Sequence, residues 1–310
     1  MFFGLTDQAT AFRAGLRDVL PTACTPATIR AAWDGDPCES MWKTLGAYGV
    51  LGLIVPESAG GLGLDALSLV AAMEECGYHG VPGPLVETVV IAPRLGLALD
   101  GSARVAISDA RQPVVPYAAV ATHVFDADLG QLLDDVTASP VSTVDGTRQA
   151  ARVTGTPNGE PVTDLGSTWR LAMLCTSAFL LGLARRQVDM TVSYLKERRQ
   201  FGVPIGTFQG LKHPLADAVV GTEFAWPVVL QAAHSVAREA PDARRRVAHA
   251  KAAASDAAYQ VSRVCLQAHG AIGYTVEYDL HLFMKRTWAL VADWGSASDH
   301  RMTIAKELLG

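Results

Sequence analysis

A polar segment at residues 197–218 carries side chains that could bind an anion; it reads ERRQFGVPIGTFQGLKHPLADA. Arg198 and Arg199 stand beside Gln200, and Gln209 follows in the same segment. A guanidinium group can donate to two phosphate oxygens at once, which a lysine ammonium cannot do. Glycines in the segment allow tight turns and a close approach of the backbone. The chemistry fits a phosphate clamp, and it fits a solvated corner between two helices equally well.

A second segment, residues 267–274, reads QAHGAIGY and combines an amide with glycines. Gln267 ends a helical pattern, Gly270 and Gly273 follow, and Tyr274 comes next. A turn with free backbone N–H groups beside an amide side chain can bind a nucleotide. For this segment taken alone, a glycine helix cap followed by a loop is the simpler interpretation.

Other reactive residue types give weaker patterns. The histidines form neither HxxxH nor HExxH, so we expect no metal site. No GxSxG motif occurs, which argues against an α/β-hydrolase. The cysteines are odd in number, lie far apart and show no CxxC spacing, which is typical of reduced thiols in a cytoplasmic protein.

The composition excludes further classes. The formal net charge of −5 argues against general affinity for nucleic acid. No stretch reaches the roughly 20 apolar residues that span a bilayer; the nearest, residues 171–184, contains polar residues and is flanked by arginines. The start, MFFGLTDQ, shows no basic region and no small-residue cleavage site, so we expect no signal peptide.

The elements that must position these residues are mostly helical. In the N-terminal part the spacing of apolar residues predicts helices over residues 5–20, 41–50 and 67–76. We expect Pro21 to end the first helix, and Gly77 and Gly80 to end the third. From residue 167 onward the helical pattern is longer. It predicts a four-helix bundle over residues 167–196, 208–239, 242–269 and 277–309, with a break near Gly295 in the last segment.

Between these helical parts lies a region of β character. The runs ARVAIS, PVVPYAAVATHVF and RQAARVTG are rich in valine, alanine and threonine, and turn-forming residues separate them. The sequence therefore predicts a mainly α fold with a small β module. We expect an N-terminal helical domain at 1–100, a β domain at 101–166 and a C-terminal bundle at 167–310.

Taken together, these segments resemble the acyl-CoA dehydrogenase family. Its bundle carries an RxQFG…Q motif between two long helices, matched here by residues 198–202 and Gln209. Its later QxxGGxGY segment is matched by QAHGAIGY, except that Ala271 replaces the second glycine. The N-terminal region from Trp42 through VPESAGGLG is also similar to the family's, as is the order of helices, β module and bundle.

The resemblance implies FAD bound across a subunit interface. In such enzymes one protomer holds the flavin ring, and the neighbour's RxQFG…Q and QxxG segments hold the pyrophosphate and the adenosine end. The residues that would contact FAD are Arg198, Gln200, Phe201, Gln209, Gln267 and Gly270. The implied chemistry is proton abstraction α to a thioester carbonyl, with hydride transfer from Cβ to the flavin.

Two departures from the family pattern change this expectation. The β module is short and lacks the family's flavin-facing YxxTEP and GSD motifs. The catalytic carboxylate is also missing: Trp294 stands at the family's usual Glu position, and Ala172 stands at the alternative position on the first bundle helix. Neither residue can accept a proton at neutral pH. Asp293 is adjacent, but we expect it to point elsewhere, while Trp294 walls off a vestigial site.

A chain that keeps the clamp but lacks the base resembles the smaller subunit of actinobacterial heteromeric acyl-CoA dehydrogenases. These pair with a longer related subunit as a heterotetramer with two copies of each chain, and some act on steroid-derived CoA thioesters. The resemblance implies that the acyl-CoA substrate lies mainly in the partner's site. Two alternatives remain: a self-sufficient homomeric enzyme with an unrecognised base such as Asp293, and a flavin-free structural or binding protein of the same fold.

Overall fold

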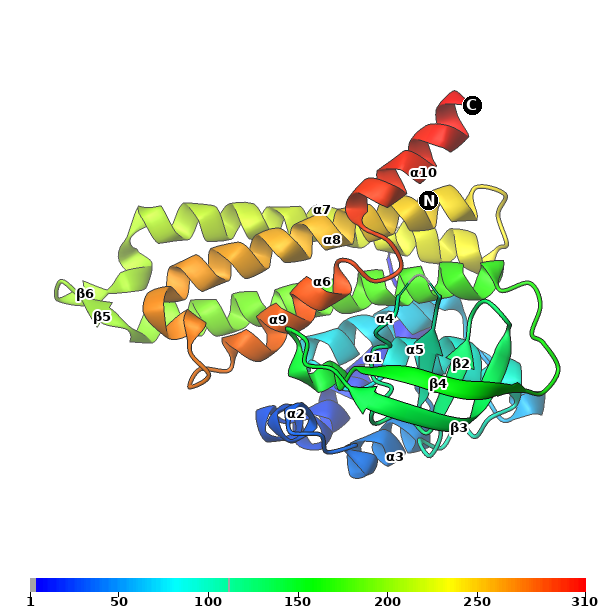
Figure 1. Cartoon of the computed structure of the whole chain (residues 1–310). Helices are drawn as coiled ribbons and strands as arrows, with labels where there is room; N and C mark the ends of the chain where they lie inside the picture. The colour runs from blue at the N-terminus through cyan, green and yellow to red at the C-terminus, as the bar shows by residue number, and fades with distance from the viewer. Residues whose placement is uncertain (1–3, 111) are drawn as a thin grey trace.

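Helices make up most of the chain, and one small sheet packs against them (Figure 1). The computed structural model describes residues 4–110 and 112–310. Residues 1–3, which carry part of the signal-peptide prediction, lie outside the described residues. The prediction of a mainly α fold with a small β module is confirmed.

The N-terminal part contains short and medium-length helices. Their bounds are α1 Asp7–Ala23, α2 Pro26–Trp33, α3 Glu39–Tyr48, α4 Ala66–Tyr78 and α5 Leu85–Ile91. Side-chain caps begin three of them, because Thr6, Thr25 and Asp65 each accept a hydrogen bond from a backbone N–H of the first turn. Helices α2 and α5 were not predicted; both are short, and α5 is buried on all sides, so it shows no amphipathic periodicity.

Two predicted helix ends in this part are wrong. Pro21 lies inside α1, which continues to Ala23. A proline near the end of a helix removes one backbone hydrogen bond without preventing the last turn. Gly77 lies inside α4, and a Cβ added there would meet the Phe179 carbonyl oxygen of α6 at 2.1 Å. Gly77 therefore permits the close packing of α4 on α6 instead of ending the helix.

The β module forms one four-stranded sheet in the order β1-β2-β3-β4. Its strands are β1 Val105–Ser108, β2 His123–Asp126, β3 Gln131–Pro140 and β4 Ala151–Asn158. The β1–β2 pair is parallel, and the β2–β3 and β3–β4 pairs are antiparallel. Strand β3 was not predicted, because none of its residues is fully buried and it contains Asp134 and Asp135 at a bulge, where Asp135 has a positive φ of 49°. The predicted run at 113–125 is mostly loop, with a strand only at its end.

The C-terminal part is a bundle of long helices, as predicted. Its helices are α6 Gly166–Glu197, α7 Gln209–Ala237, α8 Ala243–His269, α9 Leu280–Leu290 and α10 Ala297–Leu309. A small hairpin of β5 Arg199–Gln200 and β6 Val203–Pro204 connects α6 to α7. Helices α6, α7 and α8 run side by side, the hairpin lies at one end of them, and α10 projects away from the body (Figure 1).

The core of the protein runs through both helical parts. One large cluster of buried apolar residues joins the N-terminal helices to the bundle, and a smaller cluster lies within the sheet. Helix α6 has the length and apolar composition of a membrane-crossing helix, but 72% of its most apolar stretch is buried inside the protein. It is therefore the central core helix, and it positions the hairpin at its C-terminal end.

Candidate functional site

The first candidate site is a cavity of about 530 Å³ at the hairpin end of the bundle. It forms where the α6–α7 connection meets the end of α8. Five of the six residues expected to bind FAD line it: Arg198, Gln200, Phe201, Gln267 and Gly270. Two segments that are far apart in sequence thus form one site. Gln209, the sixth residue, begins α7 as an exposed residue and is not among the lining residues.

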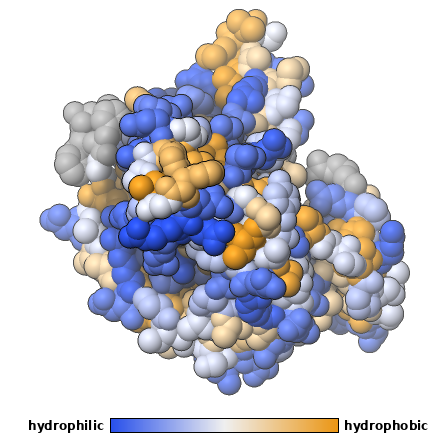
Figure 2. Space-filling model, turned by 90° about the vertical axis from the view of Figure 1, so that its left-hand side faces the viewer, coloured by the Kyte–Doolittle hydropathy of each residue, from blue (hydrophilic) through white to orange (hydrophobic). Residues whose placement is uncertain are grey.

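The hairpin presents its polar and aromatic side chains to the outside. Phe201 at its tip has a positive φ of 53° and is 91% exposed, and its ring lies edge-on to Phe208 at 6.1 Å between centroids. Arg198 is exposed and forms no ion pair with any described residue. Its guanidinium group is therefore available to a phosphate. Figure 2 shows this end of the molecule, where hydrophobic residues lie on the surface beside a band of hydrophilic ones.

The other wall of this cavity is the end of α8. Gly270 has φ 64° and ψ −140°, a backbone conformation that disfavours a side chain, and a Cβ added there would meet no atom within 4 Å. Beneath it, the ring of His269 stacks on Tyr194 at 4.5 Å, and its Nδ1–H donates to the Cys265 carbonyl oxygen. Sequence reasoning missed this aromatic floor, because neither ring belongs to a recognisable motif.

These residues fit the pyrophosphate and adenosine end of FAD. The site offers one unpaired guanidinium group, two side-chain amides and an open backbone turn, which together supply hydrogen-bond donors for phosphate oxygens. It offers no carboxylate among its lining residues that would repel an anion. On the hairpin side the cavity is open to solvent, because the hairpin residues that line it are exposed.

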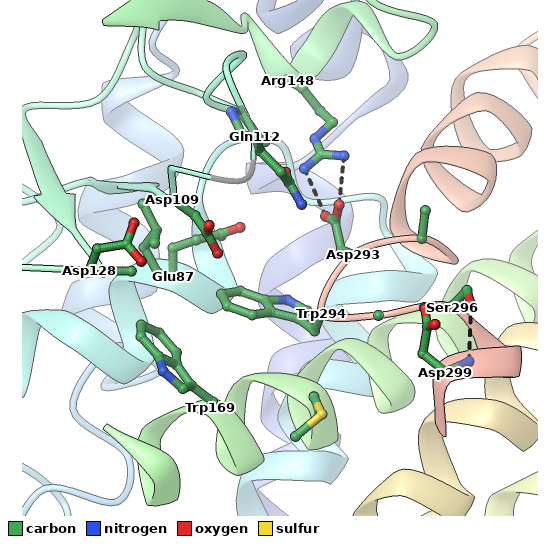
Figure 3. Close-up of a pocket in the computed structure, with 16 residues that line it drawn as sticks. Glu87, Asp109, Gln112, Asp128, Arg148, Trp169, Asp293, Trp294, Ser296 and Asp299 are labelled. Carbon is green, nitrogen blue, oxygen red and sulfur yellow. Dashed lines mark hydrogen bonds and ion pairs between the residues drawn. The ribbon is translucent and has the colours of Figure 1, made fainter. Parts of the chain in front are cut away.

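The second candidate site is a cavity of about 860 Å³ between α5, the ends of β1 and β2, the start of α6 and the turn before α10. Trp294, at the family's usual base position, lines it together with Asp293 (Figure 3). Ala172, at the alternative position, is fully buried in the core and does not line it. The described residues include no cluster that could hold a metal ion.

Trp294 lines this cavity from the turn before α10. Its backbone has a positive φ of 60°, and its ring stacks on Trp169 of α6 at 5.7 Å with 27° between the planes. Figure 3 shows the two rings one above the other, with Trp294 pointing towards Glu87. The turn is anchored from the bundle side by buried Lys251, whose Nζ donates to Ser255 Oγ at 3.0 Å and to the Val291 carbonyl oxygen at 3.2 Å. Burial lowers the pKa of Lys251 to about 8.

Asp293 does not point away from the cavity, in contrast to the prediction. Its two carboxylate oxygens accept hydrogen bonds of 3.1 and 2.7 Å from the guanidinium group of buried Arg148. Although burial disfavours the charged form of Arg148, the neighbouring charge of Asp293 contributes to raising its pKa. This bidentate pair joins the β3–β4 connection to the turn before α10 and engages both carboxylate oxygens of Asp293.

A second buried ion pair lies behind the first. Arg286 of α9 contacts Asp145 at 2.6 Å, and both side chains are almost fully buried. Arg286 also donates to the Tyr117 hydroxyl at 3.1 Å and to Thr147 Oγ1. These contacts fix the loops of the β module on the bundle.

Glu87 is a buried carboxyl group of this site, and no local pattern in the sequence distinguishes it from an exposed one. It lies on α5, lines the cavity and is only 7% exposed. Burial raises its pKa to about 7, and the nearby charge of Asp293 adds to the shift, whereas a hydrogen bond from the backbone N–H of Glu87 itself and the charges of Arg148 and Arg286 oppose it. Only the fold brings Glu87 near Arg148 and Asp293.

Comparisons with known proteins agree with this architecture. Residues 6–103 match the family model of the acyl-CoA dehydrogenase N-terminal domain, and residues 170–309 match that of the C-terminal domain. The acyl-CoA dehydrogenase IpdE2 of Mycobacterium tuberculosis is 34% identical over 84% of this chain and 85% of its own length. A solved variant of the Tcur3481–Tcur3483 steroid ACAD is 26% identical, with a TM-score of 0.84 over 98% of each chain.

The ChsE4–ChsE5 complex from Mycobacterium tuberculosis has the same fold, with a TM-score of 0.86 at 23% identity over 100% of this chain and 99% of that one. The N-terminal and the C-terminal helical parts each match a family model, and the match to IpdE2 covers most of both chains. The chain belongs to the acyl-CoA dehydrogenase family.

Proposed function

We propose that this chain is the non-catalytic subunit of a heteromeric, FAD-dependent acyl-CoA dehydrogenase. Its clamp completes the FAD site of a longer related subunit, which carries the catalytic glutamate and binds most of the acyl-CoA. The assembly dehydrogenates a CoA thioester between Cα and Cβ, and FAD supplies the hydride acceptor when bound. We take the acyl group to be steroid-derived and the assembly to hold two copies of each chain.

One contrast carries the proposal: the clamp is open to the outside, whereas the position of the base is filled. Arg198 is exposed and unpaired among the described residues, and Phe201 is 91% exposed. A large exposed aromatic residue beside a built polar site is typical of a protein interface. By contrast, Trp294, at the position where the resemblance expects the proton acceptor, stacks on Trp169, and the adjacent Asp293 is paired with Arg148.

The names of relatives support the partner and the substrate class. The solved steroid ACAD is named after two components, Tcur3481 and Tcur3483, and it matches this chain over almost its whole length. The self-sufficient alternative needs Asp293 as the base, yet both of its carboxylate oxygens accept hydrogen bonds from Arg148. The flavin-free alternative predicts no flavin in any assembly.

The test is co-expression with an acyl-CoA dehydrogenase subunit encoded by a neighbouring gene. We expect the pair to be yellow and to dehydrogenate acyl-CoA, and this chain alone to be pale and inactive. A yellow, active homo-oligomer would instead support the self-sufficient enzyme. A stable pair without flavin would support the binding protein.

A matched pair of variants tests the clamp itself. Arg198→Ala should weaken FAD binding by the complex about 10- to 100-fold, because a charge-assisted hydrogen bond contributes about 1.5–3 kcal/mol. Arg199 is exposed in the same hairpin but does not line the cavity, so Arg199→Ala should change FAD affinity by no more than a few-fold. Equal effects of the two variants on FAD titration would contradict the assignment of the clamp.

A further inference from the structure

The two halves of the clamp are held by the ends of two different helices. Arg198 caps α6, and its backbone N–H donates to the Tyr194 carbonyl oxygen at 2.9 Å. Gly270 caps α8, and its backbone N–H donates to the Gln267 carbonyl oxygen. A ligand that contacts both caps needs a fixed distance between them, and such sites depend on supporting residues behind the ones that touch the ligand.

Three aromatic rings connect these helix ends. His269, the last residue of α8, stacks on Tyr194 of α6, with 4.5 Å between the ring centroids and 18° between the planes. Tyr278, in the loop before α9, lies 4.8 Å from the His269 ring and 5.7 Å from the Tyr194 ring, measured between centroids. The Tyr278 hydroxyl donates to the Met190 carbonyl oxygen of α6 at 3.3 Å. The cluster therefore joins the end of α8 to the last turns of α6.

His269 is poorly suited to bind a phosphate group itself. A carbonyl oxygen only accepts hydrogen bonds, so the 2.8 Å contact with the Cys265 carbonyl oxygen places the proton of the neutral ring on Nδ1. Burial lowers the pKa of His269, which keeps the ring neutral at pH 7. Its Nε2 therefore carries no proton, and this atom is buried without a hydrogen-bond partner among the described residues. The ring has no free donor for a phosphate oxygen, so its contribution is the position that it fixes.

Both stacked residues lie directly beside clamp residues in the chain. Tyr194 precedes Arg198 by about one helical turn, and His269 immediately precedes Gly270. The turn after Gly270 also folds back on His269, because a Cβ added at Gly273 would meet the His269 Cβ at 3.0 Å. A shift of either ring therefore moves one half of the clamp relative to the other.

We propose that His269 is the positioning residue of the clamp: its ring, stacked on Tyr194, holds the Gly270 turn at the separation from Arg198 that the pyrophosphate of a dinucleotide spans. The ring acts through the placement of these two caps and donates no hydrogen bond to the phosphates. The identity of the ligand rests on the proposed function. The positioning does not, because it can be measured in this chain without a ligand.

The first measurement is amide hydrogen exchange of the full-length chain, followed by NMR without a ligand. His269→Ala removes the stack, so the Arg198 and Gly270 amides should exchange about tenfold faster, as expected for the loss of one aromatic pair. His269→Phe keeps a stacking ring, and the Cys265 carbonyl oxygen still accepts the backbone hydrogen bond of the helix, so exchange should stay within about threefold of wild type. His249→Ala, at an exposed histidine of the same helix, should change neither rate. Far-ultraviolet circular dichroism verifies that each variant folds.

The second measurement is titration of the flavin-free complex of this chain and the longer subunit with FAD. His269→Ala should weaken FAD binding about tenfold, and His269→Phe should retain most of the affinity. In an Arg198→Ala background, His269→Ala should cause less than about threefold further loss, because the guanidinium group that the ring places is already gone. A residue that touches FAD directly would cause the same loss in both backgrounds. Tyr194→Leu should match His269→Ala, and the double variant should bind no more weakly than either single variant.

Three results would overturn the proposal: exchange at Arg198 and Gly270 that His269→Ala leaves unchanged, equal acceleration by His269→Phe and His269→Ala, or an undiminished loss of FAD affinity in the Arg198→Ala background. Failure of the proposed function gives a different pattern. The exchange rates would then respond to His269→Ala as expected, while Arg198→Ala would leave the flavin content of the complex unchanged. That result supports the positioning within this chain and removes only its assignment to FAD.

Discussion

The two cavities of this chain are built in opposite ways. The clamp consists of exposed residues on the hairpin and at the end of α8, and the side chains of Arg198 and Phe201 face solvent. The cavity behind Trp294 is held from within by stacked rings and by two buried ion pairs. A site that is incomplete towards solvent depends on another molecule, whereas a site braced internally depends on the stability of this chain. The comparison therefore separates variants that act on assembly from variants that act on folding.

The largest effect is expected where the internal bracing is broken. Arg286→Met leaves Asp145 as a fully buried carboxylate without its cation, and removal of one partner of a buried pair costs about 3–5 kcal/mol. Arg244→Met is the control, because Arg244 forms an exposed pair with Glu307 that contributes at most about 1 kcal/mol. Chemical denaturation of both variants measures the free energy of unfolding. Losses of equal size would show that the buried pair does not hold the sheet on the bundle.

The next effect depends on pH and again concerns the internal cavity. The pKa of Glu87 is raised from 4.5 to about 7 in the folded chain, so between these values the folded state binds more protons than the unfolded state. The free energy of unfolding should therefore fall as pH rises through this window and level off above it. Glu87→Gln removes the titration. It should be more stable than wild type by about 3 kcal/mol at pH 8, with the pH-dependent part of that difference absent below pH 4.5.

Denaturation at pH 4.5, 6 and 8 tests this prediction, with Glu160→Gln as an exposed control. If the difference between Glu87→Gln and wild type stayed constant from pH 4.5 to pH 8, Glu87 would have an ordinary pKa. The sign of the pH dependence is informative. If Arg148 stabilised the Glu87 carboxylate, the free energy of unfolding would rise with pH instead of falling.

The two regions also differ in how far the sequence predicts them. Each half of the clamp is a short contiguous motif, so its residue types and spacing can be recognised in the sequence. Only the structure shows that the two motifs line one cavity. The exception is Gln209, which begins α7 and lies outside the lining of that cavity. The long bundle helices were predictable for a related reason, because their apolar periodicity extends over many turns.

The internal cavity could not be predicted in the same way. Glu87 precedes the β module, Arg148 lies within it and Asp293 follows α9, and no local pattern distinguishes a buried charge from an exposed one. Asp293 was expected to point elsewhere, since a turn at the end of a helix usually faces solvent. Its direction follows from Arg148, which the sheet brings opposite it. Strand β3 was missed because its exposed face carries residues typical of loops.

A smaller effect, confined to assembly, is expected at the hairpin tip. Phe201→Ser should change the free energy of unfolding of the isolated chain by less than about 0.5 kcal/mol, because the ring is 91% exposed. The proposed complex buries the ring, so the loss of the ring should weaken association by about 1.5–3 kcal/mol. Leu129→Ser, at an exposed residue of the β module, is the control. Chemical denaturation of the isolated chain measures the free energy of unfolding, and sedimentation of the co-purified pair measures the association constant of each variant. An association constant that Phe201→Ser leaves unchanged would place the partner on another face.

The smallest effect is expected at the position of the missing base. Asp293→Asn should leave turnover of the co-purified complex within a few-fold of wild type, because a general base contributes about 10²–10⁴-fold and Asp293 is bound by Arg148 instead. Trp294→Glu should not create activity in this chain. The new carboxylate would stand beside the Arg148–Asp293 pair, and it would remove the stack with Trp169 without restoring a flavin-facing strand. Single-turnover reduction of the complex's flavin measures both variants. A thousand-fold loss from Asp293→Asn would place the base on this chain, and the internal cavity would then be the active site.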